Sequence, residues 1–457
     1  MSSGAAGEAV PDSPQRSAIP VPVLKPNVTA RGTSRPGRPL ALLAILLAAA
    51  AGAAIAQPPG RAAAETGGAG QAEQQPAVGS TPFDRQGMWI WYVDRSEGGS
   101  VAAIVARAKR SGIGTVYIKA GDGGSFWDQF NQPLVKALHA GGLDVCAWQF
   151  VYGDSPVAEA KVGAVAVGRG ADCLVIDAEG EYEGKYASAD RYVRTLRAAI
   201  GDGYPLSLAA FPYVDYHPSF PYSVFLGPGG ATYNQPQMYW KSIQTSIRAV
   251  YEHTYLYNRL WGHPIYPIGQ TYEGPSVGDL KSFRRFAASF GGLAPSWWSW
   301  QETSGREWGA LAAASADRPV TGYRPVVSHP LLKPGSRGDL VVWAQERLIG
   351  AGLTQVPVTG VFGKATYSAV RSFQVSQGLP VDGKIGTGTW ESLMKFTPFR
   401  MRWIGGTATE DGGGASTADA GRGGAAITAT ARGGAPSRPL SASLPAKGYE
   451  IRPGPAP

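Results

Sequence analysis

Cysteine and histidine are scarce in this chain of 457 residues, which has two cysteines and five histidines. So few cysteines exclude a disulfide-rich scaffold, and no Cys/His spacing typical of a metal site is present. We therefore predict no metal and no cofactor. Basic residues form no cluster either, and the net charge of +8 is modest for this length. Nucleic acid is not expected as a partner, because binding it usually needs a concentrated basic face.

Long apolar runs are absent except for one, "PLALLAILLAAAAGAAIA" at 39–56, which follows a basic flank. Its length is at the short limit for a membrane-spanning helix. The small residues before Gln57 are typical of a signal-peptide cleavage site, whereas the long flank at 1–38 favours a retained anchor. A buried core helix is the third alternative. With a signal or an anchor the rest of the chain is extracellular or envelope-associated, and only 39–56 would contact a membrane.

Composition divides the remaining chain. The hydrophobic fraction of 44% and thirteen tryptophans suffice for a large core. The Gly-, Ala-, Ser- and Pro-rich end cannot bury enough apolar surface to fold. The predicted segments are a disordered stretch at 1–38, a leader at 39–56, a linker at 57–80, a first compact block at 81–325, a second at 330–397 and a disordered tail at 404–457.

The first block alternates short apolar runs with helix-like stretches that end in glycine. Neighbouring runs start 27 to 33 residues apart. Repeated strand–helix units of this length indicate a parallel sheet, and eight of them predict an α/β fold of the (β/α)₈ TIM-barrel type. An open doubly wound sheet is the alternative, but no Gly-rich phosphate loop follows the first strand. The runs begin near Gly87, Gly114, Leu143, Asp172, Pro205, Pro236, Ile265 and Trp297.

The fourth apolar run, "DCLVIDAEG" at 172–180, ends in two acids. Chemistry in such a barrel lies at the carboxyl ends of the strands. Asp177 and Glu179 are two positions apart, so they point the same way, and their repulsion should keep a proton on one of them near neutral pH. We interpret them as catalytic residues, with a pair of solvated loop acids as the alternative.

Aromatic and amide side chains gather near the other predicted strand ends. Flat apolar surfaces beside hydrogen-bonding groups suit a cleft that stacks sugar rings, although each of these residues could equally belong to the core. The candidates for substrate binding are Trp148, Gln149, Tyr213, Tyr239, Trp240, Gln270, Tyr272, Trp298, Trp300 and Gln301.

Three segments of this block resemble (β/α)₈ glycoside hydrolases of the family 25 lysozyme type, and the block has a looser likeness to the family 18 chitinase clan. They are "TVYIKAGDG" at 115–123, "VIDAE" at 175–179 and "WSWQETSG" at 298–305. The resemblance implies that Glu179 donates a proton to the leaving oxygen. It also implies that Asp177 stabilises the positive charge on the sugar or orients a substrate N-acetyl group.

The first strand departs from the family pattern. The lysozymes begin with Gly-x-Asp-x-Ser, whereas this chain has "GMWIWYVDRSEG", in which the nearest acid is Asp94. A further acid after their eighth strand has only Asp317 as a counterpart, and Val175 stands where family 18 has another Asp. An inactive barrel therefore remains an alternative.

The second block contains an internal repeat. "VTGVFGKAT" from Val358 recurs as "VDGKIGTGT" from Val381, with glycine at the third and sixth places and threonine at the ninth. We expect glycine to form a left-handed turn and threonine to cap the next helix. The block resembles the three-helix peptidoglycan-binding domain found beside cell-wall hydrolases. Its candidates for touching glycan are Asp382, Thr389 and Trp390.

Three functions follow from these patterns. The first is an exported lysozyme-like hydrolase that cleaves peptidoglycan glycan strands and holds the wall through its second block. The second is an inactive barrel that anchors or binds the wall, and the third is a hydrolase of another N-acetylated polysaccharide. In each case the expected partner is peptidoglycan or a related polysaccharide.

Cys146 and Cys173 fall in the predicted third and fourth strands. Adjacent strands would bring them within disulfide range, which needs Cα atoms about 4.4 to 6.8 Å apart. Two buried thiols are the preferred expectation.

Overall fold

The computed structural model describes residues 81–312 and 318–404. The predicted leader and linker, and the tail from residue 405 onward, lie outside these ranges. Within them, no helix has both the length and the apolar character needed to cross a lipid bilayer.

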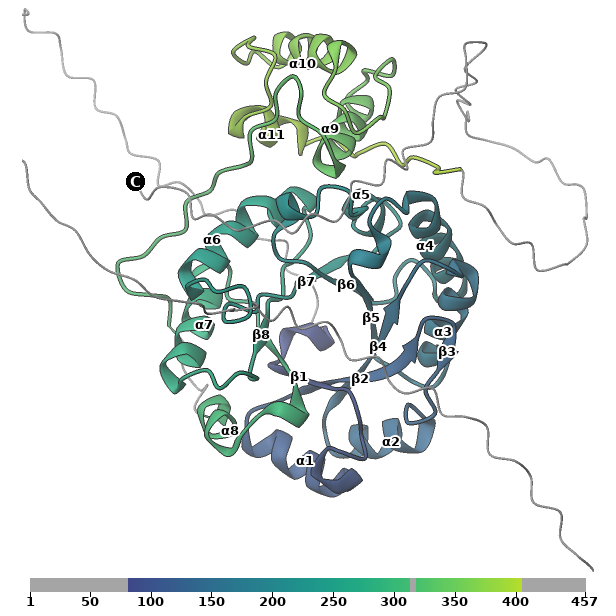
Figure 1. Cartoon of the computed structure of the whole chain (residues 1–457), viewed down its shortest axis with the longest axis vertical. Coiled ribbons are helices and arrows are strands. Elements are labelled where there is room, and N and C mark those ends of the chain that lie inside the picture. Colours follow the sequence, from purple (N-terminus) through teal and green to yellow (C-terminus); the bar gives the residue numbers. More distant parts are fainter. Residues whose placement is uncertain (1–80, 313–317, 405–457) are drawn as a thin grey trace, which may run out of the picture. The chain divides into compact units, whose positions relative to one another are not determined.

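The described part of the first block forms a nearly closed parallel barrel, as predicted (Figure 1). The sheet runs in the order β7-β6-β5-β4-β2-β1-β9-β8, and single parallel bridges from Asn234 to Ile265 and from Gln237 to Ile268 connect its two edges. The short strand β3 (Ser125–Phe126) pairs only with β2. The barrel strands are β1 (Gly87–Ile90), β2 (Thr115–Asp122), β4 (Asp144–Val151), β5 (Cys173–Ala178), β6 (Leu206–Ala210), β7 (Tyr233–Pro236), β8 (Ile268–Gln270) and β9 (Ser296–Trp298).

Helices surround this ring of strands on the outside (Figure 1). Serine or asparagine side chains cap several of them, and Ser100, for example, accepts a hydrogen bond from the Ala103 amide. The sixth predicted strand was expected to begin near Pro236, but the corresponding strand β7 ends there, because no apolar run marks it. The helices are α1 (Val101–Arg110), α2 (Gln132–Ala140), α3 (Pro156–Gly168), α4 (Tyr186–Ile200), α5 (Tyr222–Phe225), α6 (Ile247–Asn258), α7 (Val277–Ser289) and α8 (Gly305–Ala312).

Both faces of the strands are buried, which explains their nearly continuous apolar runs. Alternate side chains of β4 and β5, including Trp148 and Val175, fill the barrel interior. Their neighbours, including Leu174 and Ile176, belong to a second cluster that contains the apolar faces of the helices. The register of each strand therefore decides which of its side chains can reach the barrel mouth.

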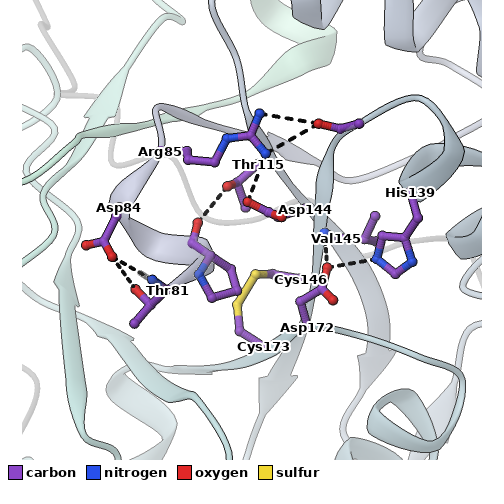
Figure 2. Close-up of polar contacts among 12 residues, drawn as sticks. Thr81, Asp84, Arg85, Thr115, His139, Asp144, Val145, Cys146, Asp172 and Cys173 are labelled. Carbon is purple, nitrogen blue, oxygen red and sulfur yellow. Dashed lines mark hydrogen bonds and ion pairs between the residues drawn. A yellow bond between two sulfur atoms is a disulfide. The ribbon is translucent and has the colours of Figure 1, made fainter. Parts of the chain in front are cut away.

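An aromatic plug closes the amino-terminal end of the barrel. The 3₁₀ turn η1 (Pro82–Asp84) places Phe83, which is 1% exposed, with its ring centroid 4.7 Å from that of Tyr233 and 5.6 Å from that of Tyr266. The Tyr266 hydroxyl donates to Asp84. Thr115 donates to the Pro82 carbonyl (Figure 2). These contacts fix the turn below the strands.

The two cysteines form a disulfide at the same end (Figure 2). Cys146 on β4 pairs directly with Cys173 on β5, and their Cα atoms are 4.6 Å apart. The expected adjacency of their strands is confirmed, and the preference for two buried thiols is wrong. The physical reason is register, since opposite inward positions on neighbouring strands bring the two sulfur atoms together.

The second block is helical, as predicted, with α9 (Asp339–Gly350), α10 (Lys364–Ser376) and α11 (Thr387–Leu393). The third residue of each copy of the repeat is a left-handed glycine, with φ of +67° at Gly360 and +71° at Gly383. A buried glutamine holds each turn: Gln345 accepts from the Gly360 amide, and Gln374 accepts from the Gly383 amide.

The repeated threonines do not cap the helices that follow them. Gly363 and Gly386 occupy the N-cap positions, and each threonine lies three residues further on. Its hydroxyl instead accepts a hydrogen bond from the buried glutamine, at 2.9 Å for Thr366. The repeat is thus explained by a glutamine that ties a turn to the start of a helix.

Helix α9 also contacts the helices of the barrel. The buried Asp339 carboxylate accepts hydrogen bonds from the Ser223 amide and hydroxyl, at 2.8 and 2.6 Å. Trp343 donates from its indole to the Leu260 carbonyl, and its ring lies 5.0 Å from that of Trp261. Two buried polar contacts and an aromatic pair therefore join the blocks.

Candidate functional site

Strand β5 positions the two acids. Cys173 and Val175 face the barrel interior, so the alternation of side chains directs Asp177 to the same side. Asp177 lies one residue before the strand ends and is 7% exposed, whereas the half-buried Glu179 follows the strand and caps the 3₁₀ turn η3 (Gly180–Tyr182). The apolar part of the strand thereby fixes both carboxyl groups at the barrel mouth.

A single amide joins the two carboxyl groups. The side-chain nitrogen Nε2 of Gln237, just beyond β7, donates to Asp177 Oδ1 and to Glu179 Oε1, each at 3.0 Å. Because both oxygens bond the same nitrogen, they lie within about 6 Å of each other. The amide therefore holds the acids as a pair.

Burial raises the pKa of both acids. The pKa of Asp177 lies well above its usual range, chiefly because the carboxyl is desolvated and next because of the Glu179 charge. Burial also raises the pKa of Glu179, although the bond from Gln237 opposes that rise. Two close, desolvated carboxyl groups do not both ionise readily, so the pair favours holding one proton between them.

Indole rings form one wall of the mouth. The Trp148 centroid lies 5.4 Å from that of Trp298 and 6.3 Å from that of Trp91, and the Trp91 and Trp298 centroids are 5.7 Å apart. Trp148 is 1% exposed, while the other two are partly exposed. The structure therefore brings two predicted residues, Trp148 and Trp298, together with Trp91, which the sequence did not indicate.

Two predicted tyrosines lie on the side of β7 and β8. Tyr239 is partly exposed, and the charges of Asp177 and Glu179 contribute to raising its pKa, after burial and Tyr272. The Tyr272 ring meets it edge-on at 5.6 Å, and the Tyr272 hydroxyl lies 2.5 Å from that of Ser242. Both tyrosines are thus neighbours of the carboxyl pair.

Six predicted substrate-binding residues serve structural contacts instead. Gln149 is fully buried and faces the helices, because its neighbour Trp148 takes the inward position; it donates to the Gly123 and Glu159 carbonyls. Trp240 packs on Phe283. The six are Gln149, Tyr213, Trp240, Gln270, Trp300 and Gln301.

The other four corrections have similar causes. Tyr213 stacks on His253 at 3.9 Å, and Trp300 packs edge-on against Trp308 at 4.8 Å. The amide oxygen of the buried Gln270 accepts from the Lys241 amide, which fixes the loop after β7. Gln301 donates to the Tyr92 carbonyl and to Ser96, which fixes the loop after β1.

The predicted glycan contacts of the second block differ in exposure. Trp390 is fully buried and donates to the Pro330 carbonyl, and Thr389 accepts from Gln374, so both are structural. Asp382 is exposed, and hydrogen bonds from the Lys384 amide and Gln374 hold its pKa below its usual range. Asp382 alone of the three presents a charge to solvent.

Two polar residues of the mouth were missed, Lys119 and Gln237, and Asp122 was considered only as a substitute acid should Glu179 fail. Lys119 and Asp122 lie within the quoted segment 115–123, so their position at a strand end was a usable signal. Gln237 follows a strand of four residues with the sequence "YNQP", which carries no apolar pattern.

The described residues thus define a (β/α)₈-barrel protein with a carboxyl pair at its mouth and a small helical domain after it. Residues 337–393 match the model of the family described as putative peptidoglycan binding domain. The chain is 38% identical over 85 residues to an uncharacterised protein of Kitasatospora aureofaciens, of which it covers 70%. By that measure the chain belongs to the same family as the Kitasatospora protein.

Other similarities are shorter or concern the fold. A spore cortex-lytic enzyme of Bacillus cereus is 39% identical over 92 residues, which are 20% of this chain and 36% of that enzyme. The chain thus spans about a third of that relative. The crystal structure of the SleB N-terminal domain is 42% identical, with coverage of 14% and 90% and a TM-score of 0.14. A class V chitinase of Pseudomonas fluorescens Pf-5 is 12% identical, with coverage of 51% and 100% and a TM-score of 0.40.

Proposed function

We propose that the barrel is a glycoside hydrolase that cleaves the glycan strands of peptidoglycan, and that the helical domain holds the enzyme on the wall. The observation that carries the proposal is the pair of Asp177 and Glu179 at the carboxyl end of β5, bridged by Gln237. Barrel enzymes place their chemistry at this end, and glycoside cleavage needs a carboxyl group that is still protonated near neutral pH.

Glu179 is the general acid in this proposal. It is the less buried of the two, so a substrate in the mouth can reach its carboxyl group. Its proton passes to the glycosidic oxygen as the bond from that oxygen to the anomeric carbon breaks. Asp177, ionised, stabilises the positive charge that develops on the sugar.

A substrate N-acetyl group supplies the nucleophile. Its carbonyl oxygen attacks the anomeric carbon while the leaving oxygen takes the proton of Glu179. Water then attacks the same carbon and gives a proton to Glu179, while the bond from the N-acetyl oxygen to that carbon breaks and restores the N-acetyl group. Substrate-assisted hydrolases of this kind need no second enzyme carboxylate across the ring. An acid and an adjacent carboxylate on one strand fit that scheme.

The lining of the mouth supports a sugar substrate. Trp91 and Trp298 are partly exposed beside the buried Trp148, and Tyr239 stands on the other side near the acids. Pyranose rings stack on such faces while their hydroxyl groups bond to polar neighbours.

Peptidoglycan is favoured over other polysaccharides by the second block. Residues 337–393 match a peptidoglycan-binding model, and relatives over 83 and 92 residues are named spore cortex-lytic enzymes. An exported, envelope-associated protein that degrades the wall it binds is the simplest combination of these observations with the barrel site.

An inactive wall-binding barrel is the second candidate, and strand β1 favours it. Trp89 of this strand faces the interior and Trp91, which follows the strand, lies at the mouth, whereas the first strand of the resembling lysozymes carries an acid. Asp94 is exposed and lies beyond the strand. A barrel that keeps only one pair of acids could bind glycan without cleaving it.

The test is to incubate the full chain and its Glu179→Gln variant with purified peptidoglycan and to analyse soluble fragments by mass spectrometry. The proposal predicts fragments with new reducing sugar ends, released by the natural chain and not by the variant. Release of peptides without new sugar ends would assign a different bond. Wall binding without any released fragment would favour the inactive barrel.

A further inference from the structure

Lys119 is the buried cation of the barrel mouth. It lies on β2 and is 3% exposed. It is neither the proposed general acid nor the carboxylate that stabilises the charge on the sugar. Its ammonium nitrogen lies 4.5 Å from the ring centroid of Trp127, 4.9 Å from Trp91 and 5.0 Å from Trp148. Indole faces attract a cation, so the three rings hold the ammonium in one place.

Strand register connects Lys119 to the carboxyl pair. Lys119 pairs with Trp148, which pairs with Val175, two positions before Asp177 on β5. The backbone of Lys119 is therefore level with Val175, one inward-facing residue further from the mouth than Asp177. Its long side chain extends toward the mouth. The ammonium nitrogen of Lys119 lies 2.5 Å from Asp122 Oδ2.

A β-bulge brings Asp122 to the row of Asp177. The β2–β4 register shifts between Lys119 and Gly121, so that Asp122 pairs with Phe150, which in turn pairs with Asp177. Bulges next to active sites commonly redirect a side chain. The Tyr152 hydroxyl also donates to Asp122 at 2.8 Å, which fixes the carboxylate that holds the lysine.

We propose that Lys119 is the positioning residue for the shared proton: its ammonium stabilises the form in which Asp177 is ionised and Glu179 carries the proton. This inference rests on the proposed function and refines it. Burial favours the opposite arrangement, with the proton on Asp177, because Asp177 is the more buried acid and is the harder one to ionise in isolation. Of the charges that act on Asp177, Lys119 is the cation, and it lowers the pKa of that group.

The remaining charged neighbours oppose Lys119. Glu179 and Glu181 follow β5, Asp122 ends β2, and all three carboxylates raise the pKa of Asp177. Tyr239 after β7 also interacts with Asp177. Removing the lysine leaves these carboxylates without the charge that opposes them, so the proton moves from Glu179 to Asp177.

The test compares Lys119→Met with Lys119→Arg. The titration of the Asp177 carboxyl is followed by carbon-13 NMR, assigned with the Asp177→Asn variant. Turnover of peptidoglycan is measured on the same proteins. Without the charge, the Asp177 midpoint should rise by about one pH unit or more, and turnover should fall about tenfold or more, because each unit changes the ratio of the two proton positions tenfold. Arginine keeps the charge and should keep both values near those of the natural chain.

Asp122→Asn is the matched variant with the opposite sign. It removes a negative charge that raises the pKa of Asp177, so the midpoint should fall, and it serves if the methionine variant does not fold. A folded methionine variant with an unchanged Asp177 midpoint overturns the inference, as does an unchanged or raised midpoint in Asp122→Asn. Absence of glycan turnover in the natural chain would instead count against the proposed function, since the titration needs no substrate.

Discussion

The two ends of the barrel are built from different kinds of side chain. At the amino-terminal end, Phe83, Tyr266 and the disulfide fill the space below the strands. At the carboxyl end, Asp177 and Lys119 are almost as well buried but carry ionisable groups. One end is closed by apolar packing that stabilises the fold, whereas the other keeps desolvated charges that cost stability and suit chemistry.

Phe83→Ala should give the largest effect on stability. The ring is 1% exposed and contacts three tyrosines, so its loss should lower the free energy of unfolding by about 3–5 kcal/mol. Denaturant unfolding measures it. In the conditions where the variant remains folded, the pH profile of turnover should be unchanged. A shifted profile would mean that the two ends are not independent.

Removal of the disulfide by Cys146→Ala with Cys173→Ala should lower the free energy of unfolding by about 2–4 kcal/mol, because the crosslink restricts the unfolded chain. Unfolding with and without reductant measures the same effect in the natural chain. Thiol labelling of unfolded, unreduced protein is the control and should find no free thiol. Two labelled thiols would contradict the pairing.

Unlike the two preceding changes, Asp177→Asn should favour the folded chain as the pH rises. The pKa of Asp177 is raised in the folded chain, so its contribution to stability is present at low pH and is lost as the pH rises toward the folded value. Asparagine does not ionise. The variant should therefore lose less stability than the natural chain between about pH 4 and neutral pH, by about 1 kcal/mol or more. Equal pH dependence of unfolding in both proteins would show that burial of this carboxyl has no such cost.

The same substitution should move the pH profile of turnover. Without the neighbouring charge the pKa of Glu179 falls, so its proton is lost at lower pH. The alkaline limb should shift down by about one pH unit. Turnover at a range of pH values measures the shift, and Phe83→Ala is the control that should leave the limb in place.

The sequence was sufficient to predict the barrel because its early strands are apolar on both faces and its helices end in glycine. It also indicated Asp177 and Glu179, since they follow the buried apolar run of β5. Gln149 could have been corrected from alternation alone, because an inward Trp148 requires its neighbour to face outward.

Other features have no local signal. The bulge that redirects Asp122 depends on pairing between two strands, and no residue pattern in β2 shows it. Gln237 reaches the carboxyl pair because β7 lies two strands from β5 in the barrel, a relation between residues 58 and 60 positions apart. The role of Gln345 and Gln374 in the helical repeat is not visible in the repeat itself, because each glutamine lies before its turn in the sequence.

The central claim is that Glu179 carries the proton for bond cleavage, and Glu179→Gln tests it most directly. Glutamine keeps the size and much of the hydrogen bonding of the side chain but cannot donate that proton. On peptidoglycan that the natural chain demonstrably digests, turnover should fall about a hundredfold or more, while folding and sedimentation with insoluble wall stay the same. Full activity of this variant on that substrate would contradict the account and place the acid elsewhere in the barrel.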